Sequence, residues 1–506
     1  MLFPLFAPRV AILFAALLSP VAFAAPFSVV AYNVENLHDL DGIALYDEYQ
    51  PSTWTPEHLR VKTANIAQVL ARVNKGAGPE IVAFNEIELD QTTDSTITDH
   101  AAWLASVKDT TAAALLGKGS LSSVLAGLPA EAWLLKACAD AGLGPYHVAV
   151  TDERPSKHEN GHGAAVRNVL FSRFPVTAVK SHHLKNARAI LEVTVDVEGS
   201  PLTVFVNHWK SGAGDTALEE IRRDNARVLR ARIDELLKTD PNADFIIAGD
   251  LNSHYNQKQR YRDMRTTGIN DVLGSQGNEL AIRGKDRDLY NLWFELPSDQ
   301  RGSDTFKGEW GTLMHLIVSR GLYDQNGVQY DDGSFAVMKF PGLNANGVGL
   351  PNRWSRGKVP GGFSDHFPVY ARFRVVETRD KDKWLPLTRP SETENGPEVA
   401  VAVETAPVDL LANALRYDKL PADTNIRDGS FNGRVFLVEA PGRVNERGHV
   451  RVTLGGEEYD VFSHQKEVRD EVRGRARSQP VVRFYGELGI YRGNWQFLIH
   501  GREWLR

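Results

Sequence analysis

Apolar runs of strand length recur along the chain from residue 27 to residue 375 and predict a protein rich in β-structure. They are rich in Val, Ile and Phe, which favour strands, and they read FSVVAYNVENL, EIVAFNEIE, AAVRNVLFSRFPV, ILEVTVDV, LTVFVNHWKS, DFIIAGDLNSH, LMHLIVS and FPVYARFRVV. Two segments between them, HLRVKTANIAQVLARV and LEEIRRDNARVLRARIDELL, carry apolar residues at helical spacing, and residues 100–144 are typical of a helical insertion. This alternation predicts the α/β class, with sheets covered by helices.

One of these predicted strands ends in an unusual way. The apolar run from Phe245 to Ala248 is followed by Asp250, Asn252 and His254 at every second position. Because side chains alternate along a strand, these three polar groups are expected on one side and Leu251 on the other. Such a group either caps a turn or forms part of an active site.

The chain of 506 residues is too long for one ordinary core, and its composition divides it into segments. Residues 1–24 predict an export signal peptide, because Arg9 precedes a short apolar run and Ala22-Phe23-Ala24 suits cleavage. The run is too short for a membrane anchor and is followed by Pro20, so we expect no membrane insertion after cleavage and a secreted or periplasmic location. The single cysteine, Cys138, excludes intramolecular disulfides and zinc sites built on several thiolates.

Residues 25–376 form the first predicted domain. Residues 377–428 are charged and poor in periodicity, which is typical of a linker, and residues 429–506 return to β-type sequence in a smaller unit. Within that unit Gly455-Gly456 and Arg492-Gly493-Asn494 predict tight turns between strands. The sequence indicates no protein partner.

Polar residues that suit phosphate and metal chemistry stand at the ends of five predicted strands. They are Asn33 and Glu35, Asn85 and Glu86, Asn207 and His208 with Lys210 beyond, Asp250 and Asn252, and Asp365 and His366. Oxygen ligands suit a hard cation, Mg²⁺ or the chemically similar Mn²⁺, and Ca²⁺ is also compatible. Such a cation beside two imidazoles and neutral amides suits displacement at phosphorus. Taken singly, each residue has a structural explanation as a turn residue, a local hydrogen-bond partner or a surface charge.

In order and wording, NVENL, FNEIE, NHWKS, AGDLNS and FSDHFPV resemble the motifs of the endonuclease/exonuclease/phosphatase superfamily. The segments NLWFELP, RGS and GEWGTL add a similarity to its secreted bacterial nucleases. The resemblance implies a four-layer α/β/β/α sandwich of two packed sheets, with the site where strands end at one edge. It also implies hydrolysis of phosphate esters that depends on a divalent metal.

The resemblance further implies roles for individual residues at the metal and the substrate. Glu86 and Asn33 match the family's metal-site residues, with Glu86 as the principal ligand, and Asp365 is expected to help to hold the metal. Arg188 stands where the family often has a structural or phosphate-facing arginine. Lys210 follows the NHW segment, and we expect it to contact substrate as well.

Four residues match the catalytic positions of the family. Asp250 and Asn252 match the pair that handles the attacking water and the phosphate. His208 matches a histidine that hydrogen-bonds the scissile phosphate. His366 matches the general base or transition-state stabiliser.

The chain departs from the family at Met314. In most members the strand before the last motif reads Leu-Asp-His or Leu-Asp-Gln, and the aspartate orients the catalytic histidine, whereas this chain has Leu-Met-His. A thioether cannot accept a strong hydrogen bond from an imidazolium. Three interpretations remain: reduced activity, replacement by another acid such as Asp304, or nucleic-acid binding with little turnover.

The C-terminal unit combines basic and aromatic residues. Residues 427–506 contain 14 Lys and Arg against 11 Asp and Glu, hence 14 − 11 = +3, although the whole chain carries −6. The residues expected to contact nucleic acid are Arg473, Arg475, Arg477, Tyr491 and Trp495, since charge follows the backbone and rings stack on bases. The stretch GELGIYRGNWQFLI resembles the closing strands of an OB-fold, and we predict a small all-β barrel of that kind.

These observations favour an exported, metal-dependent phosphodiesterase that hydrolyses nucleic acid, above all DNA. One alternative is a phosphoesterase of the same superfamily that acts on phospholipids or small phosphate esters. Another is a catalytically weakened nucleic-acid-binding protein, which Met314 favours. Serine-hydrolase and ATP-dependent mechanisms are unsupported, because the chain has no Gly-x-Ser-x-Gly and no Walker-type loop.

Overall fold

The computed structural model describes residues 25–92, 97, 99–117, 121–153, 165–283, 288–355, 358–387, 390–391, 401–403, 410 and 413–506. The predicted signal peptide lies outside the described residues, as do residues 388–389, 392–400, 404–409 and 411–412 of the predicted linker. Within the described part of the chain, no helix has the length and apolar character needed to cross a bilayer.

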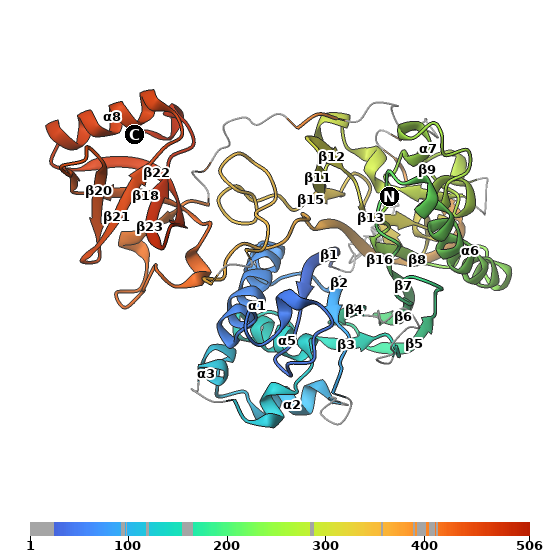
Figure 1. The fold of residues 1–506 in the computed structure, drawn as a ribbon. Coiled ribbons are helices and arrows are strands. Elements are labelled where there is room, and N and C mark those ends of the chain that lie inside the picture. The colour runs from blue at the N-terminus through green and yellow to red at the C-terminus, as the bar shows by residue number, and fades with distance from the viewer. Residues whose placement is uncertain are drawn as a thin grey trace, which may run out of the picture.

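Two seven-stranded sheets pack face to face and form the first part of the molecule (Figure 1). The first has the order β14-β16-β1-β2-β4-β3, with β15 also paired to β16. Its strands are β1 (Phe27–Leu37), β2 (Ile81–Glu88), β3 (His147–Val150), β4 (Val166–Ser172), β14 (Asp324–Tyr330), β15 (Ala336–Val337) and β16 (Val369–Trp384). The second has the order β5-β6-β7-β8-β13-β10-β9. Its strands are β5 (Val176–His182), β6 (Ile190–Val197), β7 (Ser200–His208), β8 (Phe245–Asp250), β9 (Ser275–Gln276), β10 (Leu289–Asn291) and β13 (Met314–Val318).

Helices cover the outer face of each sheet, so that the predicted α/β/β/α layering is confirmed (Figure 1). Buried residues of α1 (Pro56–Leu70) and α5 (Ala130–Asp140) pack with apolar side chains of β1, β2 and β4 on the first sheet. The long α6 (Thr216–Thr239) covers β7 and β8 with Ala226, Leu229 and Ile233. The predicted insertion contributes α2 (His100–Ser106), α3 (Ala112–Leu116) and α4 (Ser123–Ala126) beside α5.

Burial explains why the central strands are continuous apolar runs. Every residue of β8 is buried, because one face of the strand packs against the other sheet and the opposite face packs against α6. The parallel pair β7·β8 ends at His208–Asp250, and the parallel pair β1·β2 runs in regular register to Asn33–Asn85 and shifts before Leu37–Ile87. The polar strand ends of the sequence therefore meet at one edge of the sandwich.

Strand β16 continues through the boundary that the charged composition indicated at residue 376. It runs to Trp384, and Asp380 and Trp384 pair with Gln325 and Asp324 of β14. Charged residues are compatible with this pairing because the side chains of Arg379, Lys381, Asp382 and Lys383 are exposed. Between β10 and β13, the chain also forms a hairpin from β11 (Asp304–Phe306) and β12 (Glu309–Gly311).

The C-terminal unit is a seven-stranded sheet with the order β17-β18-β22-β23-β21-β20-β19. Its strands are β17 (Leu415–Arg416), β18 (Val435–Ala440), β19 (Gly442–Val444), β20 (Val450–Leu454), β21 (Glu457–Phe462), β22 (Val482–Tyr491) and β23 (Asn494–Leu498). The predicted turns are confirmed, since β20 and β21 pair across Gly455-Gly456 and β22 and β23 pair from Tyr491 to Asn494. The consecutive strands β18 and β19 lie towards opposite ends of the sheet, where they pair with β22 and β20, respectively.

The prediction that this unit is all-β is wrong, because α8 (Lys466–Ser478) contains the three arginines of the RGRAR segment. Val468 and Val472 form the buried face of α8 at helical spacing. On its surface, Lys466 forms an ion pair with Asp470, and Glu471 forms one with Arg475; the partners in each pair are one helical turn apart. The high charge of this segment obscures the two-residue apolar stripe in the sequence.

Arg434 and Arg60 connect the C-terminal unit to the sandwich. The buried Arg434 guanidinium donates to Gln68 Oε1 of α1 at 2.8 Å and to the Gly342 carbonyl at 3.2 Å. Arg60 of α1 forms an ion pair with Asp428 at 2.7 Å. These contacts place the β22·β23 face beside the loop from residue 352 to residue 362.

A buried ion pair fixes α6 on the second sheet and yields a prediction about acid stability. Arg232 makes two hydrogen bonds of 2.8 Å to the Glu192 carboxylate, which also contacts His182 Nε2 at 2.7 Å. Burial alone would raise the pKa of Glu192, but Arg232 and His182 outweigh burial and lower this pKa to about 2. The stabilisation is therefore complete above the unfolded-state pKa and is lost as the pH falls towards 2.

We expect Arg232→Met to lower the free energy of unfolding at pH 7 by about 2–4 kcal/mol, because Glu192 loses its bidentate partner. The difference from wild type should shrink between pH 5 and pH 2, as Glu192 becomes protonated in both proteins. Thermal unfolding of the full chain at several pH values measures this. A difference that stays constant down to pH 2 would show that the ion pair does not carry the effect.

Candidate active site

Four side chains from four strand ends meet at one edge of the sandwich. The carboxamide Nδ2 of Asn33 (β1) donates to Glu86 Oε1 (β2) at 3.0 Å and to Asp250 Oδ2 (β8) at 3.1 Å. His208 Nε2 (β7) lies 3.7 Å from Glu86 Oε1 and 3.8 Å from Asp250 Oδ2. His366 completes the group, with its Nε2 3.6 Å from Asp250 Oδ2.

The backbone at these strand ends adopts conformations that are rare for residues with a side chain. The φ angles are 52° at Glu35, 65° at Glu86 and 46° at Asn252. The strand registers shift between Asn33 and Leu37 and between Phe84 and Ile87, as expected for bulges that re-aim side chains. Left-handed conformations cost on the order of 1–3 kcal/mol each and concentrate at functional sites.

Beneath the site, the buried carboxamide of Asn85 connects the two sheets. Its Oδ1 accepts a hydrogen bond from the Asp250 backbone N–H at 2.9 Å, and its Nδ2 donates to the Asn207 carbonyl at 2.9 Å and to Asn168 Oδ1 at 2.8 Å. Gly249 is required here, because its φ is +116° and an added Cβ would lie 2.2 Å from the Asn207 carbonyl oxygen. Asn85 thus fixes the backbone that presents Asp250 and His208.

The two histidines of the site have opposite electrostatic environments. Burial lowers the pKa of His208 well below its usual value, and the positive charges of Arg188 and His366 lower it further. Burial would also lower the pKa of His366, but Asp365, Asp250 and Asp304 outweigh it and raise this pKa well above its usual value. At neutral pH the site therefore combines a neutral imidazole with an imidazolium.

Asp365 supplies the carboxylate that the sequence lacks at Met314. His366 Nδ1 lies 2.7 Å from Asp365 Oδ1, while Asp365 Oδ2 faces Arg353 at 3.2 Å. Met314 is fully buried and is the cross-strand partner of Asp250. Asp304 forms a β-bridge with His366, and its Oδ1 accepts a hydrogen bond from the Leu313 N–H at 3.2 Å. Two acids, Asp365 by direct contact and Asp304 through its charge, thus stabilise the His366 cation.

The remaining sequence candidates lie around this group. Asn252 is buried, and its Nδ2 donates to the Trp209 carbonyl at 3.2 Å. Arg188 is partly buried and acts on His208 through its charge. Lys210 is partly exposed, and its backbone N–H donates to Asn225. The expectation that His254 lies on the same side as Asp250 is wrong, since β8 ends at Asp250 and His254 instead accepts a hydrogen bond from the Thr312 backbone.

The site also contains Glu35, Lys62 and Arg353, for which the sequence predicts no role. Glu35 accepts a hydrogen bond from the Trp354 N–H at 2.8 Å and lies 3.6 Å from Arg353. The fully buried Lys62 of α1 donates to the Glu35 carbonyl at 2.7 Å and lies over the Trp354 ring. In the sequence, Lys62 stands on the apolar face of a predicted helix, and this position is the sign that it is buried. The sequence around Arg353 gives no indication of its contact with the site.

The donor set fits a hard divalent cation. Glu86 has the most exposed side chain of the group, at 17%, and Asp250 contributes further oxygens beside it. Asn33 turns its amide nitrogen towards both carboxylates, while its Oδ1 accepts a hydrogen bond from the Glu35 N–H at 3.0 Å. Burial raises the pKa of Asp250 to about 6, against the opposing charge of His366, so that its carboxylate gains from a nearby cation. His208 Nδ1 and His366 Nε2 are buried without hydrogen-bond partners among the described residues.

The comparisons with known proteins agree with this geometry. Residues 166–375 match the model of the Endonuclease/Exonuclease/phosphatase family. The matched region contains His208, Asp250 and His366, whereas Asn33 and Glu86 precede it. None of the curated proteins compared with the chain is a significant match.

Several solved structures are similar to this chain at low identity and with low TM-scores. Truncated TDP2 from Caenorhabditis elegans is 14% identical, with 69% of this chain and 98% of that chain covered and a TM-score of 0.36. TDP2 from D. rerio, complexed with single-strand DNA product, is 12% identical with 69% and 99% covered and a TM-score of 0.37. Sphingomyelinase C from Streptomyces griseocarneus is 16% identical with 70% and 100% covered and a TM-score of 0.36.

Because Asp365 already contacts His366, we predict that an aspartate introduced at position 314 does not increase turnover. We expect Met314→Asp to leave turnover unchanged or lower, because it places a further carboxylate in a buried position beside Asp250. Asp365→Asn should reduce kcat by roughly 10³-fold or more, since the imidazolium loses its direct partner. Steady-state kinetics of the two purified variants measure this. Increased turnover in Met314→Asp would mean that Asp365 does not replace the usual acid.

Proposed function

We propose that the protein is a divalent-metal-dependent phosphodiesterase that hydrolyses DNA, and the match of residues 166–375 to the model of the Endonuclease/Exonuclease/phosphatase family supports this. One observation carries the proposal: the carboxylates of Glu86 and Asp250 and the imidazoles of His208 and His366 meet at one edge of the sandwich. The Nε2 atom of each imidazole lies less than 4 Å from a carboxylate oxygen of the group. That set provides a cation site, a base for water and donors for phosphate oxygens.

The protonation states assign roles to the polar groups. The His366 imidazolium, stabilised by Asp365, offers positive charge to the oxygen on which charge develops. The neutral His208 provides a hydrogen bond to the scissile phosphate without adding charge. Asp250 accepts a proton from the attacking water, and Asn252 beside it orients the phosphate.

Glu86 is the principal ligand for the cation in this proposal, with Asn33 beside it. The cation, when bound, neutralises phosphate oxygens as a Lewis acid. The network through Asn85 holds the Asp250 backbone independently of the cation. Asp365 is paired with His366 and Arg353. We therefore propose that its main role is to hold and stabilise the His366 imidazolium.

An arginine-lined hollow on the C-terminal unit supports nucleic acid as the substrate. Its lining includes Arg447, Arg451, Arg469, Arg473 and Arg492, together with Tyr491 and Phe462. Tyr491 is 57% exposed, and such a ring can stack on a base while the guanidinium groups follow the phosphates. Of the residues predicted from the sequence, this hollow contains Arg473 and Tyr491.

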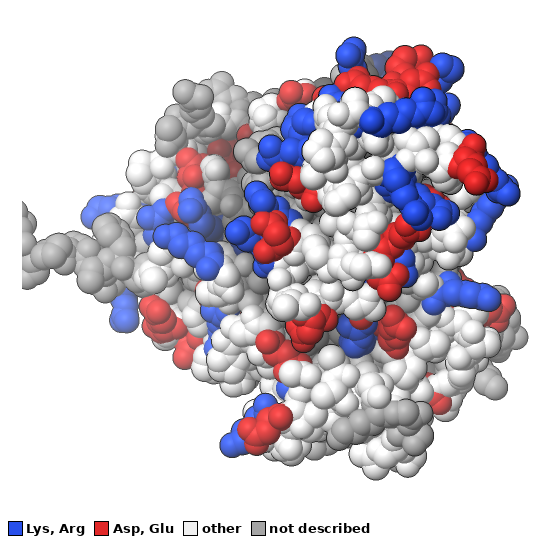
Figure 2. All heavy atoms as spheres, turned by 90° about the vertical axis from the view of Figure 1, so that its left-hand side faces the viewer, with Lys and Arg blue, Asp and Glu red and all other residues white. Residues whose placement is uncertain are grey.

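The other predicted contacts of the C-terminal unit lie elsewhere. Trp495 lines a separate groove with Arg353 and Lys358, which runs from the active-site side onto the β22·β23 face. Arg475 is paired with Glu471 and the Arg506 carbonyl, and Arg477 lies in the last turn of α8. Figure 2 shows positive and negative side chains interspersed on the face of this unit, so the contact with nucleic acid is proposed for the hollow alone.

The strand arrangement of the C-terminal unit supports its interpretation as an OB-like domain. The consecutive strands β18 and β19 lie towards opposite ends of the sheet, and β21 and β23 are parallel. A helix, α8, connects β21 to β22. OB-folds bind oligonucleotides through strands and loops of this kind. We also propose export, which rests on the sequence of residues 1–24.

We expect Asp250→Asn and Glu86→Gln to reduce DNA hydrolysis with Mg²⁺ or Mn²⁺ by at least 10²–10³-fold, because each removes a charged group of the site. A chelator should abolish wild-type activity. The measurement is cleavage of closed circular single-stranded DNA, which has no ends, compared with sphingomyelin and with bis(p-nitrophenyl) phosphate.

Glu198→Gln is the matched control, because Glu198 is exposed in the turn between β6 and β7, at the opposite end of the second sheet. It should retain wild-type activity. Equal DNA cleavage by wild type and Asp250→Asn would overturn the assignment of the site. Turnover of sphingomyelin or of small phosphate esters without turnover of DNA would instead identify the alternative substrate class, and DNA binding without cleavage would identify a weakened enzyme.

The hollow on the C-terminal unit predicts a separation between binding and chemistry. Tyr491→Ala and Arg492→Ala should each raise KM for DNA by about 5–50-fold, while turnover of bis(p-nitrophenyl) phosphate stays unchanged. Arg492→Ala should also reduce the salt dependence of binding, because it removes a cation. Arg416→Ala is the control, because Arg416 belongs to the same unit but pairs with Asp418 away from the hollow. Unchanged DNA affinity in both hollow variants would show that the unit does not bind the substrate there.

A further inference from the structure

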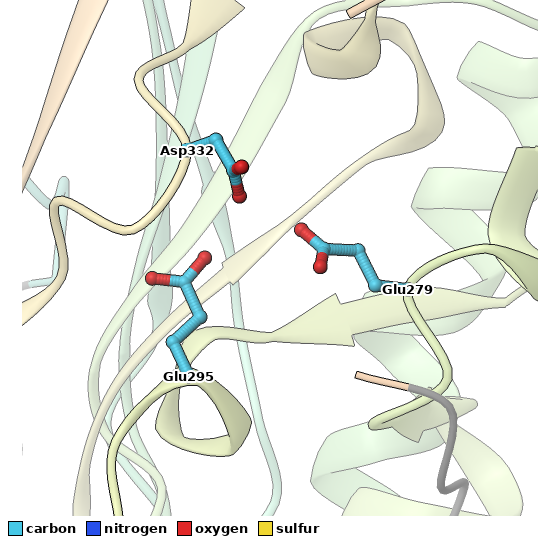
Figure 3. A group of neighbouring side chains, drawn as sticks. All are labelled: Glu279, Glu295 and Asp332. Atoms are coloured by element: carbon cyan, nitrogen blue, oxygen red, sulfur yellow. The ribbon is translucent and has the colours of Figure 1, made fainter. Parts of the chain in front are cut away.

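Three acidic side chains converge between the two sheets, away from the candidate active site (Figure 3). Glu279 follows β9, Glu295 ends the short 3₁₀ helix at Leu292–Glu295, and Asp332 follows β14. One carboxylate oxygen from each lies within 4.8 Å of the others. Figure 3 shows the three carboxylates pointing towards one another from three separate segments.

This group is distinct from the catalytic one. It lies near β10, where Tyr290 pairs with Val318 of β13, whereas Asp250 pairs with Met314 at the other end of the same strand. Four residues of extended strand separate these positions, or about 13 Å. None of the residues that form the candidate active site contributes to the group.

The hydrogen bonds to Glu279 and Glu295 come from neutral donors. The Tyr323 hydroxyl donates to Glu279 Oε1 at 2.8 Å, and the Tyr330 hydroxyl donates to Glu295 Oε2 at 2.6 Å. Burial, above all, raises the pKa of Glu279 to about 7 and that of Glu295 to about 8. Three carboxylates this close repel one another unless protons or a cation compensate their charge.

Two oxygen atoms at this acidic group are buried and have no hydrogen-bond partner among the described residues. One is Oε1 of Glu295, and the other is the hydroxyl of the neighbouring Tyr290. The Tyr290 side chain is 0% exposed. Burial and then the charges of Glu279, Glu295 and Asp332 raise the pKa of Tyr290 well above its usual value, so its hydroxyl lies within the field of all three carboxylates. A bound cation or its water would satisfy both atoms.

We propose that Glu279, Glu295 and Asp332 hold a structural Ca²⁺ ion. Ca²⁺ takes six to eight oxygen ligands in a flexible geometry, which suits three carboxylates held on separate segments, whereas Mg²⁺ needs a near-ideal octahedron and retains several waters. The ion would join a loop and a helix of the second sheet to the segment after β14 of the first sheet. Its function is to fasten the two sheets at the edge remote from catalysis.

The test measures binding and stability, and it does not depend on activity. Full-length Glu86→Gln protein, which weakens the catalytic metal site, is freed of metal with a chelator and titrated with Tb³⁺, a luminescent substitute for Ca²⁺. Excitation of tyrosine should produce sensitised Tb³⁺ emission that Ca²⁺ displaces and Mg²⁺ does not displace at the same concentration. Saturating Ca²⁺ should raise Tm by roughly 5 °C.

The variants Glu279→Gln and Glu295→Gln, made in the same Glu86→Gln background, retain a hydrogen-bond acceptor for the tyrosine hydroxyls and remove one negative charge each. In chelator their Tm should equal or exceed that of the parent, because the repulsion is reduced. In Ca²⁺ their Tm should fall below that of the parent, and the Tb³⁺ emission should be lost. Asp299→Asn, an exposed acid in the adjacent loop, should behave as the parent does in both conditions.

The two Tm values of each variant exclude a simple packing defect, since a defect lowers Tm in chelator as well as in Ca²⁺. An unchanged Ca²⁺ response in both glutamine variants would overturn the site. A parent protein whose Tm and tyrosine-sensitised emission do not respond to Ca²⁺ or Tb³⁺ would overturn it also, and would mean that shared protons compensate the three acids.

Discussion

The buried carboxamide of Asn85 is the constraint on which the site depends. It accepts from the Asp250 backbone and donates to the Asn207 carbonyl and to Asn168, so it links β2 and β4 of one sheet to β7 and β8 of the other. An amide can do this because it offers a donor and an acceptor at once, in a place where an unpaired polar group would cost about 1–3 kcal/mol. The register of the two sheets at this edge follows from that network.

The fixed edge allows strongly interacting charges to lie close together. Glu86 and Asp250 share the Asn33 amide. The two nearby histidines hold different protonation states because burial, and then the charge of Arg188, lowers the pKa of His208, whereas Asp365 contacts His366 and raises its pKa. This division explains how the chain tolerates Met314. The acid that stabilises His366 comes from the neighbouring position in sequence, with Asp304 contributing charge across the β-bridge.

The sequence predicted the sandwich and its polar edge well, because buried strands are apolar on both faces and their polar ends are conspicuous. Asp250 and His208 were found in this way. Contacts between distant segments could not be found, among them Arg353 with Asp365 and Glu279 with Glu295, since no local pattern encodes which loops meet. The helix α8 was missed because its apolar stripe is only Val468 and Val472 in a highly charged segment.

The location of the catalytic cation tests the account most directly. Crystals of the full chain soaked in Mn²⁺ would be measured near the manganese absorption edge to give an anomalous difference map. We predict a peak within about 2.0–2.3 Å of a Glu86 carboxylate oxygen, with Asp250 and Asn33 around it. An ordered Glu86 without a metal beside it, in crystals that bind Mn²⁺ elsewhere, would contradict the central claim.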